Sequence, residues 1–205
     1  MKKYLLLLSA LPFLLQCATM LKPLKDGSPV QNDKIVLVGR IVLEPELKQE
    51  FNHCIGCGSL RRKSFLVLDN RKDFMLSDDM ADVASAQAMH KAQMVGEVSW
   101  DEPFAIEVPK GDLYAKGVVV RLTATATLLI RFNAKLPDAA SGFIYIGDMV
   151  FTLNKKDKFE FSLLDNYSEI THRYEKWHQS VGLQKQLISG NMTIETFSAK
   201  VIFRY

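Results

Sequence analysis

Apolar and polar residues alternate along much of the chain from Lys34 onward, which is typical of β-strands with one buried face. In the clearest run, between Val118 and Phe132, every even-numbered position is apolar, and Arg or Thr fills most odd-numbered positions. We expect one buried face and one wet face here. Similar alternation recurs at 159–163 and 197–203, and turn-forming stretches separate the runs. Because one-sided burial is the habit of antiparallel sheets, the pattern predicts a mainly β fold, an antiparallel β-sandwich.

Two segments depart from the strand pattern. Residues 168–181 carry apolar side chains at helical spacing, which predicts one amphipathic helix packed against the sheet. The residues that form this stripe are Ile170, Tyr174, Trp177 and Val181. Residues near 78–93 follow a capping Ser77 and contain good helix formers, but their apolar face is thin. They are interpreted as a short helix or a mobile loop.

The start of the chain has the form of an export signal. Lys2 and Lys3 precede an apolar run from Leu5 to Leu15, which is too short to span a bilayer as a helix. Residues 17–33 mix Pro, Gly, Ser and Asp without an apolar period. These patterns predict a signal peptide at 1–16, a flexible tether at 17–33 and one domain at 34–205.

The end of that signal, Leu14-Leu15-Gln16-Cys17, resembles the lipobox of bacterial lipoproteins. The usual motif has a small residue where Gln16 stands, and simple secretion with cleavage after Ala18 is the alternative. The resemblance implies that Cys17 becomes the lipidated mature N-terminus, with diacylglycerol and an N-acyl chain such as palmitate as the membrane anchor. Ala18 in place of an aspartate favours the outer over the inner membrane.

Removal of the signal also changes the charge of the chain. The full sequence has 26 Lys and Arg against 23 Asp and Glu, so the loss of Lys2 and Lys3 leaves 24 against 23, or about +1. No long basic block remains that could bind phosphates. Nucleic acid is therefore not an expected partner.

The reactive side chains His53, Cys54 and Cys57 lie together in the segment FNHCIGCGSL. In an exported protein, two cysteines favour a disulfide, here a small loop between strands. A metal site formed by all three residues is the alternative, although a closed zinc site needs a fourth ligand. A redox pair is weaker because the glycines indicate a loop rather than a helix start. Covalent haem is disfavoured because Gly58, rather than histidine, follows Cys57.

Other candidate groups are weaker still. A soft-ligand set could bind Cu(I), but its members do not share one helical face: Met75, Met80, Met89, Met94 and His90. His172 and His178 are six residues apart on the expected helix and cannot act as a pair from it. The carboxylates at strand ends and helix starts are interpreted as caps and turns: Asp101, Glu102, Asp165 and Glu169. With no nucleophile elbow, metalloprotease motif or phosphate loop, we expect no enzyme and no cofactor.

A later block, LPDAASGFIYIGDMVFTL followed by KFEFSLLDNYSEI, resembles one found in poorly characterised bacterial lipoproteins with a transthyretin-like or immunoglobulin-like sandwich. The resemblance depends on Tyr145, Ile146, Gly147, Asp165 and Tyr167. The function expected is that of a lipid-anchored envelope lipoprotein, a non-catalytic structural or binding module whose partner is the membrane and an unidentified envelope protein. The alternative is a metal-binding or redox lipoprotein that uses the loop from His53 to Cys57.

Overall fold

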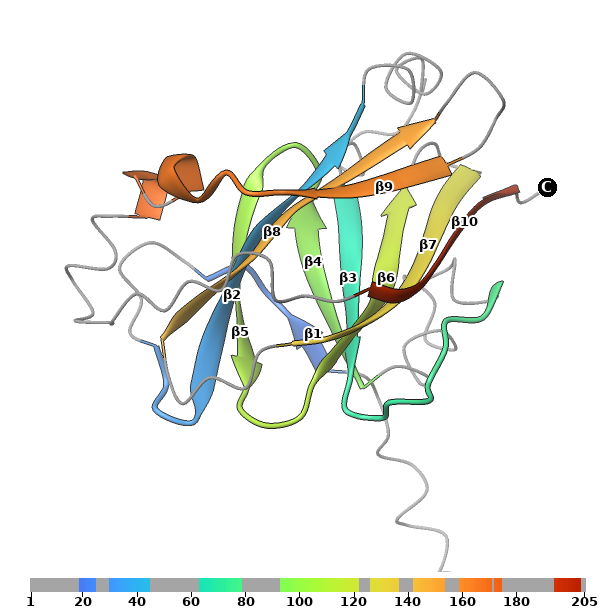
Figure 1. Cartoon of the computed structure of the whole chain (residues 1–205). Coiled ribbons are helices and arrows are strands. Elements are labelled where there is room, and N and C mark those ends of the chain that lie inside the picture. Colours follow the sequence, from blue (N-terminus) through green and yellow to red (C-terminus); the bar gives the residue numbers. More distant parts are fainter. Residues whose placement is uncertain are drawn as a thin grey trace, which may run out of the picture.

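The computed structural model describes most of the region after the expected signal. The described residues are 19–24, 30–44, 63–78, 93–121, 126–136, 142–153, 159–170, 172–174 and 194–203. Within these ranges the chain is mainly β, and its strands form two sheets that pack face to face (Figure 1). This arrangement is consistent with the predicted β-sandwich.

One sheet has six strands and the other has four. In spatial order the first contains β1 (Thr19–Leu21), β4 (Met94–Ser99), β3 (Lys63–Asp69), β6 (Tyr114–Arg121), β7 (Ala126–Lys135) and β10 (Ile194–Phe203). The second contains β5 (Pro103–Pro109), β2 (Lys34–Leu43), β8 (Phe143–Leu153) and β9 (Phe159–Leu164).

The prediction of a purely antiparallel sandwich is wrong, because both sheets are mixed. The pairs β1/β4 and β2/β8 are parallel, whereas the other pairs between named strands are antiparallel. Parallel neighbours need a long crossover. Strands of the opposite sheet lie between β2 and β8 in sequence and supply that crossover, which local alternation cannot reveal.

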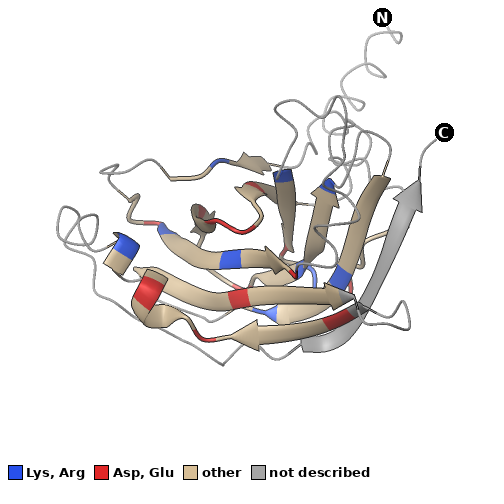
Figure 2. Ribbon diagram, turned by 90° about the horizontal axis from the view of Figure 1, so that it is seen from above, with Lys and Arg blue, Asp and Glu red and all other residues tan. Residues whose placement is uncertain are grey.

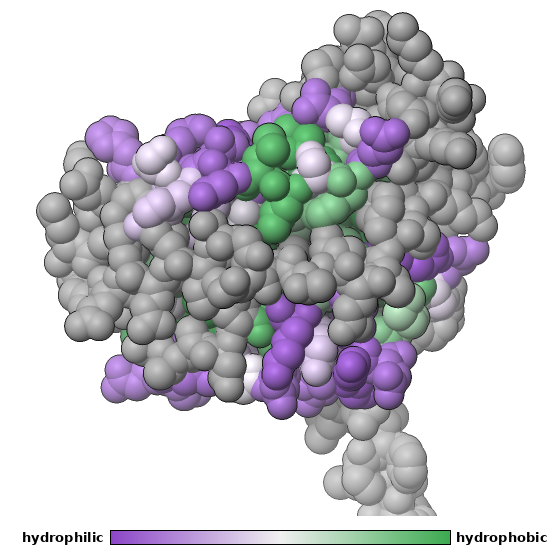
Figure 3. Space-filling view, viewed as in Figure 1, coloured by the Kyte–Doolittle hydropathy of each residue, from purple (hydrophilic) through white to green (hydrophobic). Residues whose placement is uncertain are grey.

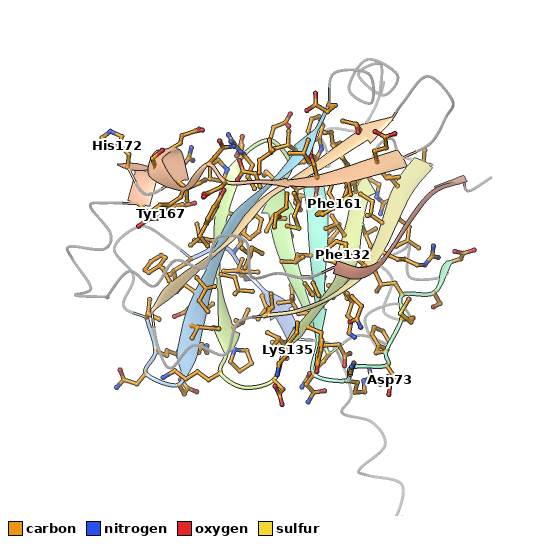
Figure 4. All side chains as sticks on the ribbon, in the orientation of Figure 1. Asp73, Phe132, Lys135, Phe161, Tyr167 and His172 are labelled. Carbon is orange, nitrogen blue, oxygen red and sulfur yellow. The ribbon has the colours of Figure 1, made fainter. Side chains whose placement is uncertain are left out.

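The core between the sheets follows the predicted alternation. The described even-numbered positions of the clearest run are buried in it: Val118, Val120, Ala126, Leu128, Ile130 and Phe132. From the other sheet, Phe161 and Leu163 pack against this core. The Phe161 ring lies 6.2 Å from that of Phe132, and Figure 4 shows these two side chains on facing sheets. The side chains of Phe159 and of residues 197–203 lie outside the described set.

The expectation of a wet outer face holds only in part. Glu160 and Ser162 of β9 are exposed as predicted, but apolar clusters lie on other parts of the outer face of both sheets. On the six-stranded sheet, Val119 and Leu129 belong to a second apolar cluster that Phe74 and Leu76 cover. On the four-stranded sheet a third apolar cluster is covered from several segments. Its members are Val36, Val38, Ala105, Phe143, Tyr145, Ile170 and Tyr174, with Leu24, Val30 and Tyr167 packed against them. The alternation identifies the strands. It does not reveal that apolar residues on the outer faces are buried by segments from elsewhere in the sequence.

Part of the expected helix at 168–181 falls within the described residues, which are helical at 167–170 and 172–174. The rest of that helix, and nearly all of the segment at 78–93, lies outside them. Residues 19–24, part of the segment expected as a tether, contain β1, and Pro23 forms a bridge with Ile106. In the described part of the chain, no helix has the length and apolar character needed to cross a membrane.

Candidate functional site

A β-bulge in the four-stranded sheet positions Asp148, a buried carboxylate with several hydrogen-bond donors. Val38 pairs with Tyr145, but Arg40 pairs with Asp148, so β8 contains one extra residue between these pairs. Ile146 and Met149 therefore both face the core, three positions apart. Without the bulge, strict alternation would direct Asp148 into the core; with it, Asp148 faces outward beside Arg40.

Glycine makes this bulge feasible. Gly147 has φ +91°, a conformation that residues with a Cβ rarely adopt, and a Cβ there would lie 2.7 Å from Leu163. On the facing strand, a Cβ on Gly39 would lie 2.9 Å from the Gly147 carbonyl oxygen. The two backbones can approach each other because both residues lack a side chain.

The Asp148 carboxylate is completely buried and accepts hydrogen bonds from three side chains. Arg40 donates from Nε at 2.9 Å and from Nη2 at 2.5 Å, both to Oδ2. Asn166 donates from Nδ2 at 2.8 Å, and the Tyr145 hydroxyl donates to Oδ1 at 3.0 Å. This ion pair joins the neighbouring strands β2 and β8. Figure 2 shows that both basic and acidic residues occur on the strands of the sandwich. Several donors of this kind compensate for the cost of burying a carboxylate.

The same network connects β8 to the short helical segment after β9. The Asn166 backbone N–H donates to the Tyr145 hydroxyl at 3.0 Å, and the exposed Glu169 accepts from Arg40 at 3.3 Å. Burial raises the pKa of the Tyr145 phenol well above its ordinary value, and the nearby Asp148 adds to that shift. Burial alone would lower the pKa of Arg40, but Asp148 and Glu169 outweigh it and raise that pKa. Tyr145 therefore keeps its proton and Arg40 its charge.

An open pocket of about 330 Å³ lies beside this network. Its lining residues are Arg40, Val42, Glu44, Asp101, Asp148, Val150, Leu164 and Asn166. Leu164 is a large apolar side chain that is 48% exposed, and the Arg40 side chain is 18% exposed. Figure 3 shows a hydrophobic area of surface over this part of the molecule, with hydrophilic residues around it. The pocket therefore combines an apolar wall with a fixed guanidinium and carboxylates.

This chemistry favours binding over proton transfer. Both Asp148 oxygens are engaged by donors, and Tyr145 is held in its neutral form, so the buried groups stabilise one another. Asp101 also has a structural role, because its backbone N–H donates to the Ile41 carbonyl at 2.5 Å and its φ of 63° forms the turn before β5. In the described residues no group of three or more His, Cys, Asp or Glu side chains could hold a metal ion.

The outer face of the six-stranded sheet has a comparable buried charge. A register shift between Ala115 and Gly117 places Lys116 on the outer face, where it is 1% exposed. Its Nζ donates at 2.6 Å to the Asn133 side chain and at 2.6 Å to the Lys72 carbonyl, and it lies 4.7 Å from the centre of the Tyr114 ring.

The residues singled out from sequence have different outcomes. Cys17, His53, Cys54 and Cys57 lie outside the described residues, so lipidation, the disulfide and the alternative metal site stay predictions. Met80, Met89, His90 and His178 also lie outside them. Met94 is buried in the core whereas Met75 is exposed, so these two do not share a site. His172 is exposed, and Asp165 accepts from the Tyr167 backbone N–H at 3.1 Å, which fits the predicted role as a cap.

Sequence reasoning did not identify Arg40 and Asp148 as partners. They are 108 residues apart, and no local pattern relates them. The available signal was the placement of Asp148 directly after the Tyr145-Ile146-Gly147 phrase, because a glycine inside a strand pattern often indicates a bulge. No protein-family model, curated protein or solved structure matches the chain.

Proposed function

We propose that this protein is a lipid-anchored lipoprotein of the bacterial cell envelope, on the outer membrane, and a non-catalytic binding module. The observation that carries the proposal is the position of β1. Thr19 already pairs with Met94, only two residues after Cys17 of the lipobox-like segment. A folded domain that starts directly after Cys17 is the arrangement expected if that residue is the mature N-terminus.

The binding role rests on the pocket beside Arg40. Its polar groups are fixed by the network around Asp148, and rigid scaffolds of this kind hold contact residues in a defined geometry. The half-exposed Leu164 supplies apolar contact area next to the guanidinium. An envelope protein that offers an apolar side chain beside a polar group is the partner this surface fits.

The lipid anchor can be tested by metabolic labelling with a clickable palmitate analogue. The full-length protein should take up the label and fractionate with membranes, whereas Cys17→Ser should lose the label. Cys54→Ser is the matched control, because it removes a thiol without touching the lipobox, and it should remain labelled. Label retained by Cys17→Ser, or absent from the full-length protein, would contradict the anchor.

The binding surface can be tested with a photo-crosslinking residue at position 164 in living cells. We expect a discrete crosslinked species from 164 and none from position 112, which is exposed on the connection between β5 and β6. Equal crosslinking from both positions, or none from 164, would contradict a partner at the pocket.

A further inference from the structure

The first strand enters the sandwich at one defined end. The Thr19 backbone N–H donates to the Gln93 carbonyl at 2.9 Å, and Thr19 pairs with Met94, the first residue of β4. From there β1 runs into the fold, where Leu21 packs against the core and Met20 against the outer cluster. These contacts hold β1 as part of the domain.

We call the end of the sandwich at which β1 begins the near end. The register brings three other features to it: the end of β3 at Asp69, the start of β6 at Tyr114 and the end of β7 at Lys135. The connection between β5 and β6 is also there, because it leads into Tyr114 and its Asp112 carboxylate forms an ion pair with Lys135. Figure 4 shows Lys135 and Asp73 on this lower side of the molecule.

Chain length then limits where an anchor on Cys17 can lie. Two residues span at most about 7 Å, whereas a strand as long as β2, with 10 residues, extends for about 33 Å. We propose that the near end rests on the lipid surface and that the domain is oriented by this short link. This inference rests on the proposed lipidation of Cys17. Because Lys110 and Lys135 are exposed at the near end, their ammonium groups would lie at the level of lipid phosphates.

The same geometry determines how the pocket is oriented relative to the membrane. Glu44 follows the end of β2, and Asp101 lies in the turn between β4 and β5, so both belong to the end opposite β1's start. A domain that stands on its near end holds this part of the pocket away from the bilayer. The binding surface then faces partners in the envelope.

Amine labelling of the acylated protein on phosphatidylcholine vesicles tests this orientation. Reactivity is measured by peptide mass spectrometry and compared with that of soluble Cys17→Ser protein. Lys110 and Lys135 should lose most of their labelling on vesicles. Lys63, which begins β3 at the opposite end, should label equally in both samples. Phosphatidylcholine has no net charge, so any protection reflects the link rather than attraction to an anionic surface.

A spacer variant provides the matched control. Insertion of about 20 Gly and Ser residues between Ala18 and Thr19 adds a root-mean-square span of roughly 25 Å, which should restore the labelling of Lys110. If Lys110 is labelled as strongly on vesicles as in solution, while acyl chains on Cys17 are verified by mass, the orientation is overturned and the anchor still stands. Absence of acyl chains would overturn both.

Discussion

The outer faces of the two sheets use the same backbone device for different purposes. Each contains a bulge at a glycine, Gly147 in β8 and Gly117 in β6, and each bulge directs a neighbouring charged residue away from the core. Asp148 meets a guanidinium, a phenol and an amide beside an open pocket. Lys116 donates to an amide oxygen and a backbone carbonyl under a covering segment.

The two networks therefore differ in whether the charged residue is accessible to a partner. Around Asp148 the network leaves Arg40 partly exposed beside a pocket, so the charge is available to a partner. Around Lys116 the bond to the Lys72 carbonyl holds the chain that brings Phe74 and Leu76 onto the sheet. We therefore expect substitutions around Asp148 to affect both stability and the binding surface, and those around Lys116 and Gly117 to affect stability and the packing of the outer cluster.

The largest effect is expected from Asp148→Ala. Removal of the carboxylate leaves Arg40, Tyr145 and Asn166 without their shared acceptor, and breaking a buried pair of this kind costs about 3–5 kcal/mol. Urea unfolding measures the change. Glu169→Ala is the control, because that partner of Arg40 is 63% exposed and should cost below about 1 kcal/mol. Equal costs for the two variants would mean that Asp148 does not organise the site.

Alanine at the bulge glycines should give the next largest effects. A Cβ on Gly117, at φ +153°, would lie 2.2 Å from the Ile130 carbonyl oxygen, so Gly117→Ala should lower the unfolding free energy by about 2–4 kcal/mol. Gly147→Ala should cost less, because its Cβ meets the flexible end of Leu163. Gly111→Ala controls for φ alone, since no atom lies within 4 Å of its Cβ position. A Gly111→Ala cost as large as that of Gly117→Ala would exclude the backbone clash as the cause.

Lys116→Met is expected to lower the unfolding free energy by a smaller amount than the preceding variants. The apolar chain keeps most of the volume but removes the donor to Asn133 and Lys72, so we expect a loss of about 1–2 kcal/mol. Faster amide exchange at Phe74 and Leu76 should accompany it. Lys135→Met, at an exposed lysine, is the control and should leave exchange there unchanged. Unchanged exchange in Lys116→Met would show that the lysine does not hold the cover.

The smallest expected effect is a pH dependence at the near end. Burial alone would raise the pKa of Asp69, but hydrogen bonds and charge from Arg71, with the Gln93 N–H, outweigh it and hold that pKa below its ordinary 3.8. The stabilisation is therefore present above about pH 4 and is lost as the pH falls through the folded-state pKa. The unfolding free energy, measured at a series of pH values from 7 to 3, should fall less steeply for Asp69→Asn than for the unsubstituted protein. Parallel curves would contradict a lowered pKa.

The sequence predicts the strands well because apolar residues at Val118, Val120, Ile130 and Phe132 report directly on a buried face. It does not predict the covered outer faces. Val119 and Leu129 look like exceptions to a wet face until Leu76, which is distant in sequence, is seen to cover them. The parallel pairing of β2 with β8 depends likewise on chain path rather than on local pattern.

The candidate site was only partly accessible from sequence. The phrase Tyr145-Ile146-Gly147 stood out, and Asp165 was interpreted as a cap, which fits its bond to Tyr167. The pairing of Arg40 with Asp148 required the register shift at Gly147, and a bulge moves residues between faces without changing composition. Position in the fold, rather than residue type, defines this site.

The proposal that this protein is a lipid-anchored module can be tested by measuring the intact mass of the protein extracted from its own membrane. Native and denaturing spectra should both give a chain that begins at Cys17, carries acyl chains and lacks two hydrogens because Cys54 and Cys57 are joined. A mature chain without acyl chains would contradict the lipid anchor, and a native mass raised by a metal with both cysteines reduced would contradict the disulfide.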